Sequence, residues 1–204
     1  MPSRPFSRRI VLNVGLFLGA SVLAGRAFGA DVIGIAVRLR GQGVLTRSST
    51  PHALQVNDPL MDGDTVATSS ASYAELMLHT RTTINLGPDS TFGIDRFVAD
   101  LGGVIDIGGT IVFDRPDDLA PIDLTLRSTF AQIGVRGTRF FAGPSNGAFA
   151  VFVERGRVSV TAAGETRDLL AGDGVDIATA GGPPGGVVRW GEARIAAAFA
   201  SAGL

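Results

Sequence analysis

Short runs of alternating apolar and polar residues fill most of the chain, and this period-two pattern is typical of half-buried β-strands. In Tyr73–His79 the apolar residues Ala74, Leu76 and Leu78 share one face of the predicted strand. Turn chemistry such as Gly87-Pro88-Asp89 separates the runs. The pattern predicts strands over 32–39, 44–46, 53–56, 65–68, 73–79, 83–86, 91–97, 104–107, 110–113, 122–126, 133–142, 149–153 and 158–161. We therefore expect an all-β domain of the sandwich, barrel or solenoid kind.

The run Ile133–Ala142 is rich in strand-forming residues but is broken by glycines, which predicts a bent or bulged strand. Arg136 and Arg139 lie three apart, so they face opposite sides unless a bulge at Gly137 resets the phase. An inward arginine needs a carboxylate partner such as Glu154. An outward arginine is free to contact an anionic ligand or partner. The cost of an unpaired buried charge favours the structural role for Arg136.

Two further patterns concern turns. Runs 149–153 and 158–161 predict a hairpin with Arg155-Gly156 at its tip, since Gly accepts the positive φ of a tight turn. The strand from Leu169 to Val175 then closes the β region. It repeats the pattern of residues 60–66, with an apolar pair, a Gly-Asp turn and a re-entering Val, which suggests two related coils of one architecture.

Beyond residue 180 the composition changes. Residues 181–189 begin with a Gly/Pro-rich stretch that predicts a linker. Residues 190–204 are rich in Ala and predict a short C-terminal helix. Ile195 and Phe199 are four residues apart and share one face with Trp190, so we expect this helix to cap the β body.

Residues 1–29 have the form of a secretory signal peptide: a charged start, a short apolar stretch and small residues at a cleavage zone. The pair Arg8-Arg9 resembles the twin-arginine type of signal. A retained membrane anchor is the alternative, but the apolar run is short for a span and is diluted by glycine. We expect cleavage and export to the periplasm or beyond, with no membrane span left after processing.

The charge balance and the absence of cysteine argue against several classes of function. Outside residues 1–29 the chain carries 14 basic and 19 acidic groups, which argues against a nucleic-acid binder. There is no Cys, which excludes disulfides, thiolate metal sites and thiol nucleophiles.

The remaining side chains offer little chemistry. His52 and His79 are 27 residues apart and are expected to be surface residues. Asp-rich turns have the oxygen ligands that Ca²⁺ prefers, but Asp is also the ordinary residue of turns, and we favour the turn role. These aspartates are Asp58, Asp62, Asp64, Asp114, Asp117 and Asp118. We expect no enzyme activity and no cofactor.

The order and spacing of several motifs resemble the FecR domain family, over roughly residues 35–180. The motifs are Gly63-Asp64, Ala74-x-Leu76-x-Leu78, Ile133-x-Val135-Arg136-Gly137-Thr138-x-Phe140, Val151-x-Val153-Glu154-x-Gly156-x-Val158-x-Val160 and Leu170-Ala171-Gly172. The resemblance implies a twisted β-solenoid or sandwich-like domain of residues 30–180. It also implies structural roles for Arg136, Gly137, Thr138, Glu154, Gly156 and Gly172.

Well-known FecR members relay a receptor signal to a sigma factor through a cytoplasmic helical segment, a membrane helix and a receptor-contacting domain. We expect this chain to depart from that pattern in all three parts: a leader stands at its start, no later segment is expected to span a membrane, and a linker and one helix follow the domain. These differences imply that sigma-factor regulation does not carry over. We therefore expect an exported, non-catalytic recognition module that binds an envelope or membrane signalling protein. The alternative is a structural or adhesive protein that binds envelope glycan or polymer. The sequence leaves the oligomeric state open.

Overall fold

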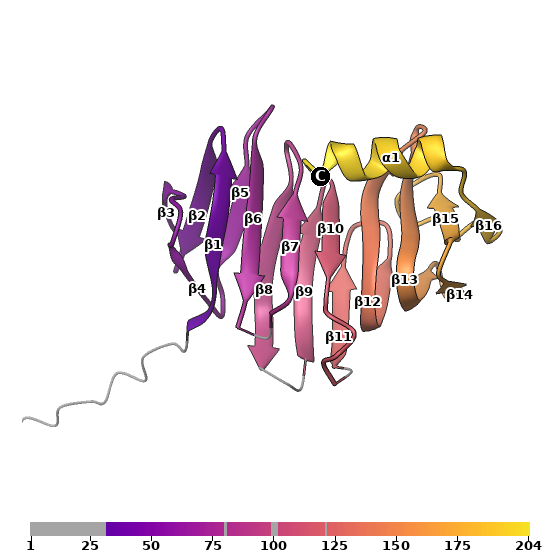
Figure 1. The fold of residues 1–204 in the computed structure, drawn as a ribbon, viewed down its shortest axis with the longest axis horizontal. Helices are drawn as coiled ribbons and strands as arrows, with labels where there is room; N and C mark the ends of the chain where they lie inside the picture. The colour runs from indigo at the N-terminus through magenta and orange to yellow at the C-terminus, as the bar shows by residue number, and fades with distance from the viewer. Residues whose placement is uncertain (1–31, 80, 99–101, 121) are drawn as a thin grey trace, which may run out of the picture.

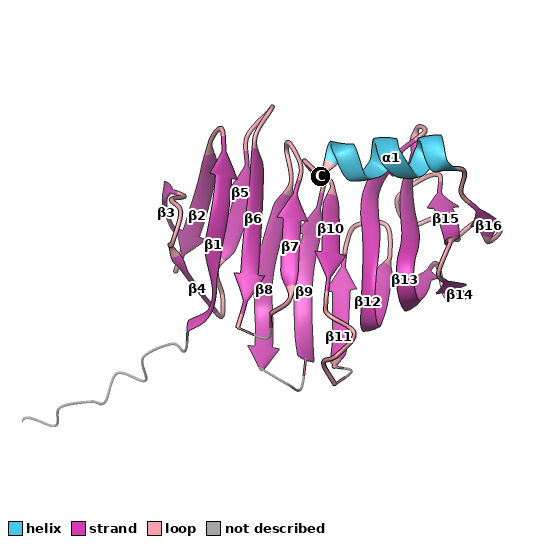
Figure 2. Cartoon of the chain, in the orientation of Figure 1, coloured by secondary structure: helices cyan, strands magenta, loops and turns pink. Residues whose placement is uncertain are grey.

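The computed structural model describes residues 32–79, 81–98, 102–120 and 122–204 (Figure 1). The predicted signal peptide over 1–29, with Arg8 and Arg9, lies outside the described residues. The chain is built from strands and one helix (Figure 2). The strands are β1 Val32–Arg40, β2 Gly43–Arg47, β3 Thr50–Ala53, β4 Pro59–Met61, β5 Thr65–Thr68, β6 Tyr73–Leu78, β7 Thr83–Leu86, β8 Thr91–Val98, β9 Gly102–Gly108, β10 Ile111–Asp114, β11 Asp123–Arg127, β12 Gln132–Ser145, β13 Ala148–Ala162, β14 Glu165–Leu170, β15 Asp173–Ile177 and β16 Val188–Arg189, and the helix is α1 Glu192–Ser201.

All of these strands belong to one hydrogen-bonded sheet, which folds over into two layers and does not close (Figure 1). The front layer contains β4, β1, β6, β7 and β10, and the rear layer contains β3, β2, β5, β8, β9 and β11. The long hairpin β12–β13 joins the layers at one end. This arrangement confirms the predicted all-β class with a short C-terminal helix.

The core lies between the layers and follows the predicted alternation. Ala74, Leu76 and Leu78 of β6 are almost completely buried, as are Ile84 and Leu86 of β7. Their counterparts from the rear layer form part of the same apolar cluster, among them Leu45, Val66, Phe92, Ile105 and Leu124. Burial of this continuous cluster is the main favourable term that holds the two layers together.

The hairpin β12–β13 belongs to both layers because each strand is bent midway. β12 pairs with β11 through Gln132–Val135 and with β10 through Arg139–Ala142. Between Arg136 and Arg139, β12 has one residue more than β13, and in the next step β13 has one residue more than β12. Two compensating bulges of this kind bend a strand pair without losing its register. The bulge expected at Gly137 therefore exists, and it directs the hairpin from the rear layer to the front layer.

The predicted hairpin with Arg155-Gly156 at its tip is wrong. The two runs form one strand, β13, and its hairpin partner is β12, with Asn146-Gly147 at the turn. Gly156 does have a positive φ of 86°, but it uses this conformation in the bend. Sequence reasoning mistook an internal bulge for a strand end, because glycine marks both.

The first edge strand is also shifted from its prediction. The pattern predicts this strand over 53–56, whereas β3 spans Thr50–Ala53 and includes Pro51. Its four residues are exposed, and β3 pairs only with β2. Proline is tolerated there because an edge strand has one side without a hydrogen-bonding partner.

Helix α1 lies across the outer face of the front layer, near β10, β12 and β13 (Figure 1). Trp190 stacks on Phe152 with ring centroids 4.9 Å apart, and Phe199 meets the edge of the same ring. Arg194 bonds Asp176 at 2.6 Å and lies over Trp190. The expected capping of the β body by this helix is thus confirmed.

Residues 181–189 include β16, which pairs with β15, so part of the predicted linker is hydrogen-bonded to the sheet. The division at residues 30, 180 and 190 stays a prediction. Among the described residues, no helix combines the length and apolar character that a bilayer span requires.

Candidate interaction surface

The residues singled out by the FecR resemblance gather at the bend of β12 and β13. Thr138 is fully buried, and its carbonyl accepts the Arg115 N–H at 3.0 Å. Glu154 and Gly156 lie on the facing strand. Gly172 comes from the turn after β14, and its N–H donates to the Val153 carbonyl at 2.7 Å. The backbones of Arg136 and Gly137 complete the bend, and their side-chain positions lie outside what the structure describes.

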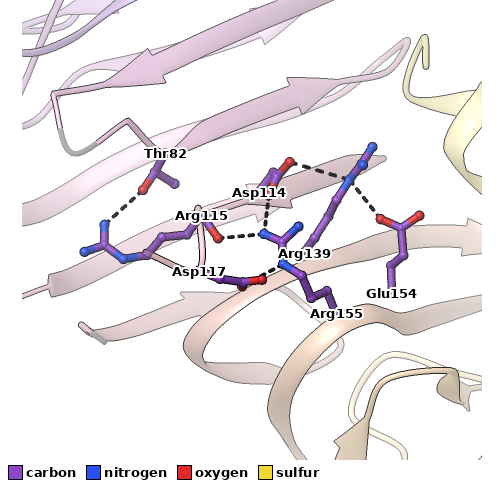
Figure 3. Close-up of polar contacts among 7 residues, drawn as sticks. All are labelled: Thr82, Asp114, Arg115, Asp117, Arg139, Glu154 and Arg155. Atoms are coloured by element: carbon purple, nitrogen blue, oxygen red, sulfur yellow. Dashed lines mark hydrogen bonds and ion pairs between the residues drawn. The ribbon is translucent and has the colours of Figure 1, made fainter. Parts of the chain in front are cut away.

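A network of charged side chains surrounds this bend (Figure 3). We call it the bend cluster and define it as Asp114, Asp117, Arg139, Glu154 and Arg155, together with Arg115, which joins through its backbone carbonyl. Arg155 has the most contacts: it donates to Asp117 at 2.7 Å, and to Asp114 and the Arg115 carbonyl at 2.9 Å each. The Arg155 side chain thereby connects the loop after β10 to β13.

Arg139 is shared between two carboxylates. Its Nε lies 3.1 Å from Glu154 and 3.6 Å from Asp114, as ion pairs without an aligned hydrogen bond. Its guanidinium also lies 5.2 Å from the ring centre of Phe199 on α1, within the range of a cation–π contact. The carboxylate that sequence reasoning offered to Arg136 is therefore paired with Arg139.

Arg115 is a member of the cluster that sequence reasoning missed. Only 1% of it is exposed, yet it carries a full charge. It donates to the Thr82 hydroxyl at 3.2 Å and to the Ala120 carbonyl at 2.8 Å. A buried guanidinium needs such partners because desolvation of a charge is costly. Its position between Asp114 and Pro116 in an Asp-rich loop was the available signal.

The Asp-rich turns use their carboxylates for arginine and for backbone amides. Asp118 pairs with Arg81 at 2.6 Å, and this hydrogen bond holds the pKa of the Asp118 carboxyl below its ordinary value. Asp58 accepts the Gln55 N–H at 2.8 Å. In the part of the chain that the structure describes, no three acidic or histidine side chains are grouped for a metal ion. The two histidines are exposed, as expected.

The electrostatics of the cluster favour permanent ion pairs. Burial opposes the charge of the Arg155 guanidinium, but the hydrogen bonds and charges of Asp117 and Asp114 outweigh burial and raise its pKa above the ordinary value. Arginine stays charged at any physiological pH in any case. The Arg155 guanidinium therefore serves to bind and orient its partners.

An apolar groove adjoins the bend cluster on the side of α1. We call it the helix groove; it is lined by Arg139, Glu154, Glu192, Ile195, Ala196, Phe199 and Leu204. Leu204 is 48% exposed, and the Glu154 side chain is 41% exposed. Glu192 makes no hydrogen bond or ion pair with the described residues. Exposed apolar side chains beside an unpaired carboxylate, that of Glu192, have the chemistry of a recognition surface.

Comparison with known proteins assigns the fold to a family. Residues 64–159 match the family model described as FecR protein. Over these residues the chain is similar to the FecR family. The match includes all of the bend cluster, whereas Gly172 and α1 lie beyond it. The helix groove therefore joins FecR residues, Arg139 and Glu154, to a helix outside the matched stretch.

Solved structures show the same fold. Two crystal structures, each of a candidate anti-sigma factor from Parabacteroides distasonis ATCC 8503, were determined at 2.50 Å and 1.65 Å resolution. The first has a TM-score of 0.54 at 18% identity and the second 0.53 at 16%, each over 65% of this chain. The chain spans 62% and 63% of their lengths. No curated protein matches the chain.

Proposed function

We propose that this chain is an exported, non-catalytic recognition module of a signalling system, which binds an envelope or membrane protein through the helix groove. The FecR domain supports a regulatory role, and the two structures with the same fold are described as candidate anti-sigma factors. The observation that carries the proposal is the helix groove, where exposed apolar and acidic side chains lie beside the ion pairs of the bend cluster.

The chemistry of the groove indicates what its partner presents. Phe199, Ile195 and Leu204 offer apolar contact, and Glu192 and Glu154 stand at its border. The complementary surface has an apolar side chain flanked by Lys or Arg. Such a pairing gives both buried area and electrostatic specificity.

The partner is tested by capture followed by reconstitution. The full chain retains proteins from an envelope extract of the source organism, and each candidate is then purified and titrated against it. We expect Glu192→Arg and Leu204→Asp each to weaken binding about tenfold, because each change opposes the predicted partner chemistry. Glu165→Arg, a charge reversal of equal size on β14, serves as the matched control. Equal affinity for all variants, or no binding by any captured protein, contradicts the proposal.

Export is tested separately with the leader. The Arg8-Arg9 pair and the sequence after it support a twin-arginine route. We expect replacement of both by Lys to leave the tagged chain in the cytoplasmic fraction, while a matched Arg4→Lys change leaves export unaltered. Normal export of the double variant contradicts that route.

A further inference from the structure

The outer face of the rear layer carries a second hollow, and it shares no lining residue with the helix groove. It lies where β11, β12, β13 and β14 run side by side, and it has a volume of about 500 Å³, within the range of small-ligand sites. The residues that line it are Ile122, Asp123, Gly134, Val135, Arg157, Ser159 and Asp168.

Sheet register fixes the arrangement of the polar residues. Gly134, Ser159 and Asp168 are direct neighbours on β12, β13 and β14. Arg157 is two residues from Ser159 on β13, so both side chains project from the same face. The strands thus hold four groups of different chemistry, a bare backbone, a hydroxyl, a carboxylate and a guanidinium, in one small area.

Gly134 gives the hollow its floor. A Cβ atom at this position would lie 2.7 Å from the Ser159 hydroxyl oxygen, closer than real Cβ contacts allow. Glycine therefore keeps the Ser159 hydroxyl accessible and lets a ligand approach the backbone of β12.

The charged side chains at the hollow differ from those of the bend cluster and from Arg127. The side chains of Asp123, Arg157 and Asp168 make no hydrogen bond or ion pair with the described residues. By contrast, Arg127 on the same layer binds Asp95 and Asp106, and the bend cluster is fully paired. Three charged groups around one hollow have thus kept their hydrogen-bonding capacity for a molecule from outside.

We propose that this hollow binds a neutral, hydroxyl-rich ligand of the saccharide class. Two carboxylates against one guanidinium disfavour an anion, and Arg157 disfavours a simple cation. Hydroxyl groups satisfy both kinds of residue because each donates to a carboxylate and accepts from a guanidinium. Gly134 accommodates the flat face of a sugar ring. This proposal is independent of the protein partner proposed for the helix groove.

The test is NMR titration of the full, ¹⁵N-labelled chain with cellobiose, maltose and chitobiose, and separately with inorganic phosphate and spermidine. We expect saturable shifts of the Gly134 and Ser159 amide signals with at least one disaccharide, and none with the two ions. Arg157→Gln and Asp168→Asn should each weaken binding about tenfold, the size of one lost hydrogen bond to a charged group.

Glu165→Gln, on the same strand as Asp168 but outside the hollow, should bind as the wild type does. The amide spectrum of each variant also reports whether it is folded, and Arg157→Gln alone suffices if Asp168→Asn fails to fold. Absence of shifts with all three disaccharides overturns the proposal. So do shifts that map elsewhere, or shifts at Gly134 with phosphate or spermidine.

Discussion

Two turns with almost the same sequence pattern, residues 60–66 and 169–175, lie in different parts of the molecule. Gly63 and Gly172 have φ values of 82° and 88°. Asp64 accepts the N–H three residues before it at 2.8 Å, and Asp173 does the same at 2.9 Å. The Gly63 N–H also donates to the Ile94 carbonyl of β8, which pairs with β5 after the turn. In the same way the Gly172 N–H donates to the Val153 carbonyl of β13, which pairs with β15. The two turns are therefore one device used twice, as the sequence echo suggested.

The difference lies in the arginine that completes each turn. Asp64 is fully buried and receives two hydrogen bonds from Arg47, at 2.7 Å and 2.9 Å. The hydrogen bond to Asp64 raises the pKa of Arg47, which burial alone would lower. Asp173 has one longer contact of 3.3 Å with Arg189, whose side chain is 69% exposed. The first turn is thus stabilised by a buried ion pair, whereas the second has only an exposed one.

The largest effect is expected from Asp64→Ala. This change leaves the Arg47 guanidinium without its carboxylate and removes the acceptor of the Met61 N–H. We expect a loss of about 3 kcal/mol in the free energy of unfolding, near the lower limit for broken buried pairs because Arg47 is partly exposed. Urea denaturation measures it. A loss below about 1 kcal/mol would show that the buried Arg47–Asp64 pair does not stabilise the turn more than an ordinary hydrogen bond does.

Gly63→Ala and Gly172→Ala are expected to lower the free energy of unfolding by equal amounts, and by less than Asp64→Ala does. Both glycines need a positive φ, which costs an L-residue roughly 1–2 kcal/mol. An added Cβ meets nothing within 4 Å at Gly63, and at Gly172 it meets the flexible end of Arg189. The same urea measurement should give equal losses for the two variants. A much greater loss at either position would separate the turns in backbone geometry as well as in pairing.

Asp173→Ala should cost about 1 kcal/mol, the usual net value of one hydrogen bond. The change removes the acceptor of the Leu170 N–H, while Arg189 returns to solvent. Thermal unfolding of this variant beside Asp64→Ala gives the contrast directly. Equal melting temperatures for the two variants would contradict the claim that the Arg47–Asp64 pair stabilises its turn more than the Arg189–Asp173 pair does.

The smallest effect belongs to Arg189→Gln. An exposed ion pair contributes between zero and about 1 kcal/mol, so we expect a change of less than about 0.5 kcal/mol. Arg47→Gln is the matched comparison and should cost several times more, because it leaves Asp64 buried without its cation. The ratio of the two losses, measured by urea denaturation, expresses the difference between the turns as a single number.

Local patterns in the sequence predicted much of the local structure, though not all of it. Alternation identified the inward faces of β6 and β7, and the turn echo was found from seven residues in each copy. The same reasoning failed at Gly156, because a bulge and a strand end use the same residue. It also gave no distinction between Asp64 and Asp173, since burial depends on Arg47 and Arg189, which are distant in sequence.

The candidate surfaces could be predicted only in part. Glu154 and the bend were identified from the FecR resemblance, but the pairing of Glu154 with Arg139 depends on how the two bulges set the phase of β12. Arg115 and Arg157 could not be placed, because Thr82, which binds Arg115, precedes β7, and the residues around Arg157 come from β11, β12 and β14. Such contacts are set by the order of strands in the sheet.

The bend in β12 and β13 has a consequence for how the protein unfolds. Because each of these strands hydrogen-bonds in both layers, neither layer can open along its length without disrupting the other. Proteins open in contiguous cooperative units, and we expect the shared strands to make the two layers one such unit in amide hydrogen exchange. The slowest-exchanging amides of both layers should therefore report a single opening free energy, and the hairpin makes the two-layer sandwich one thermodynamic unit.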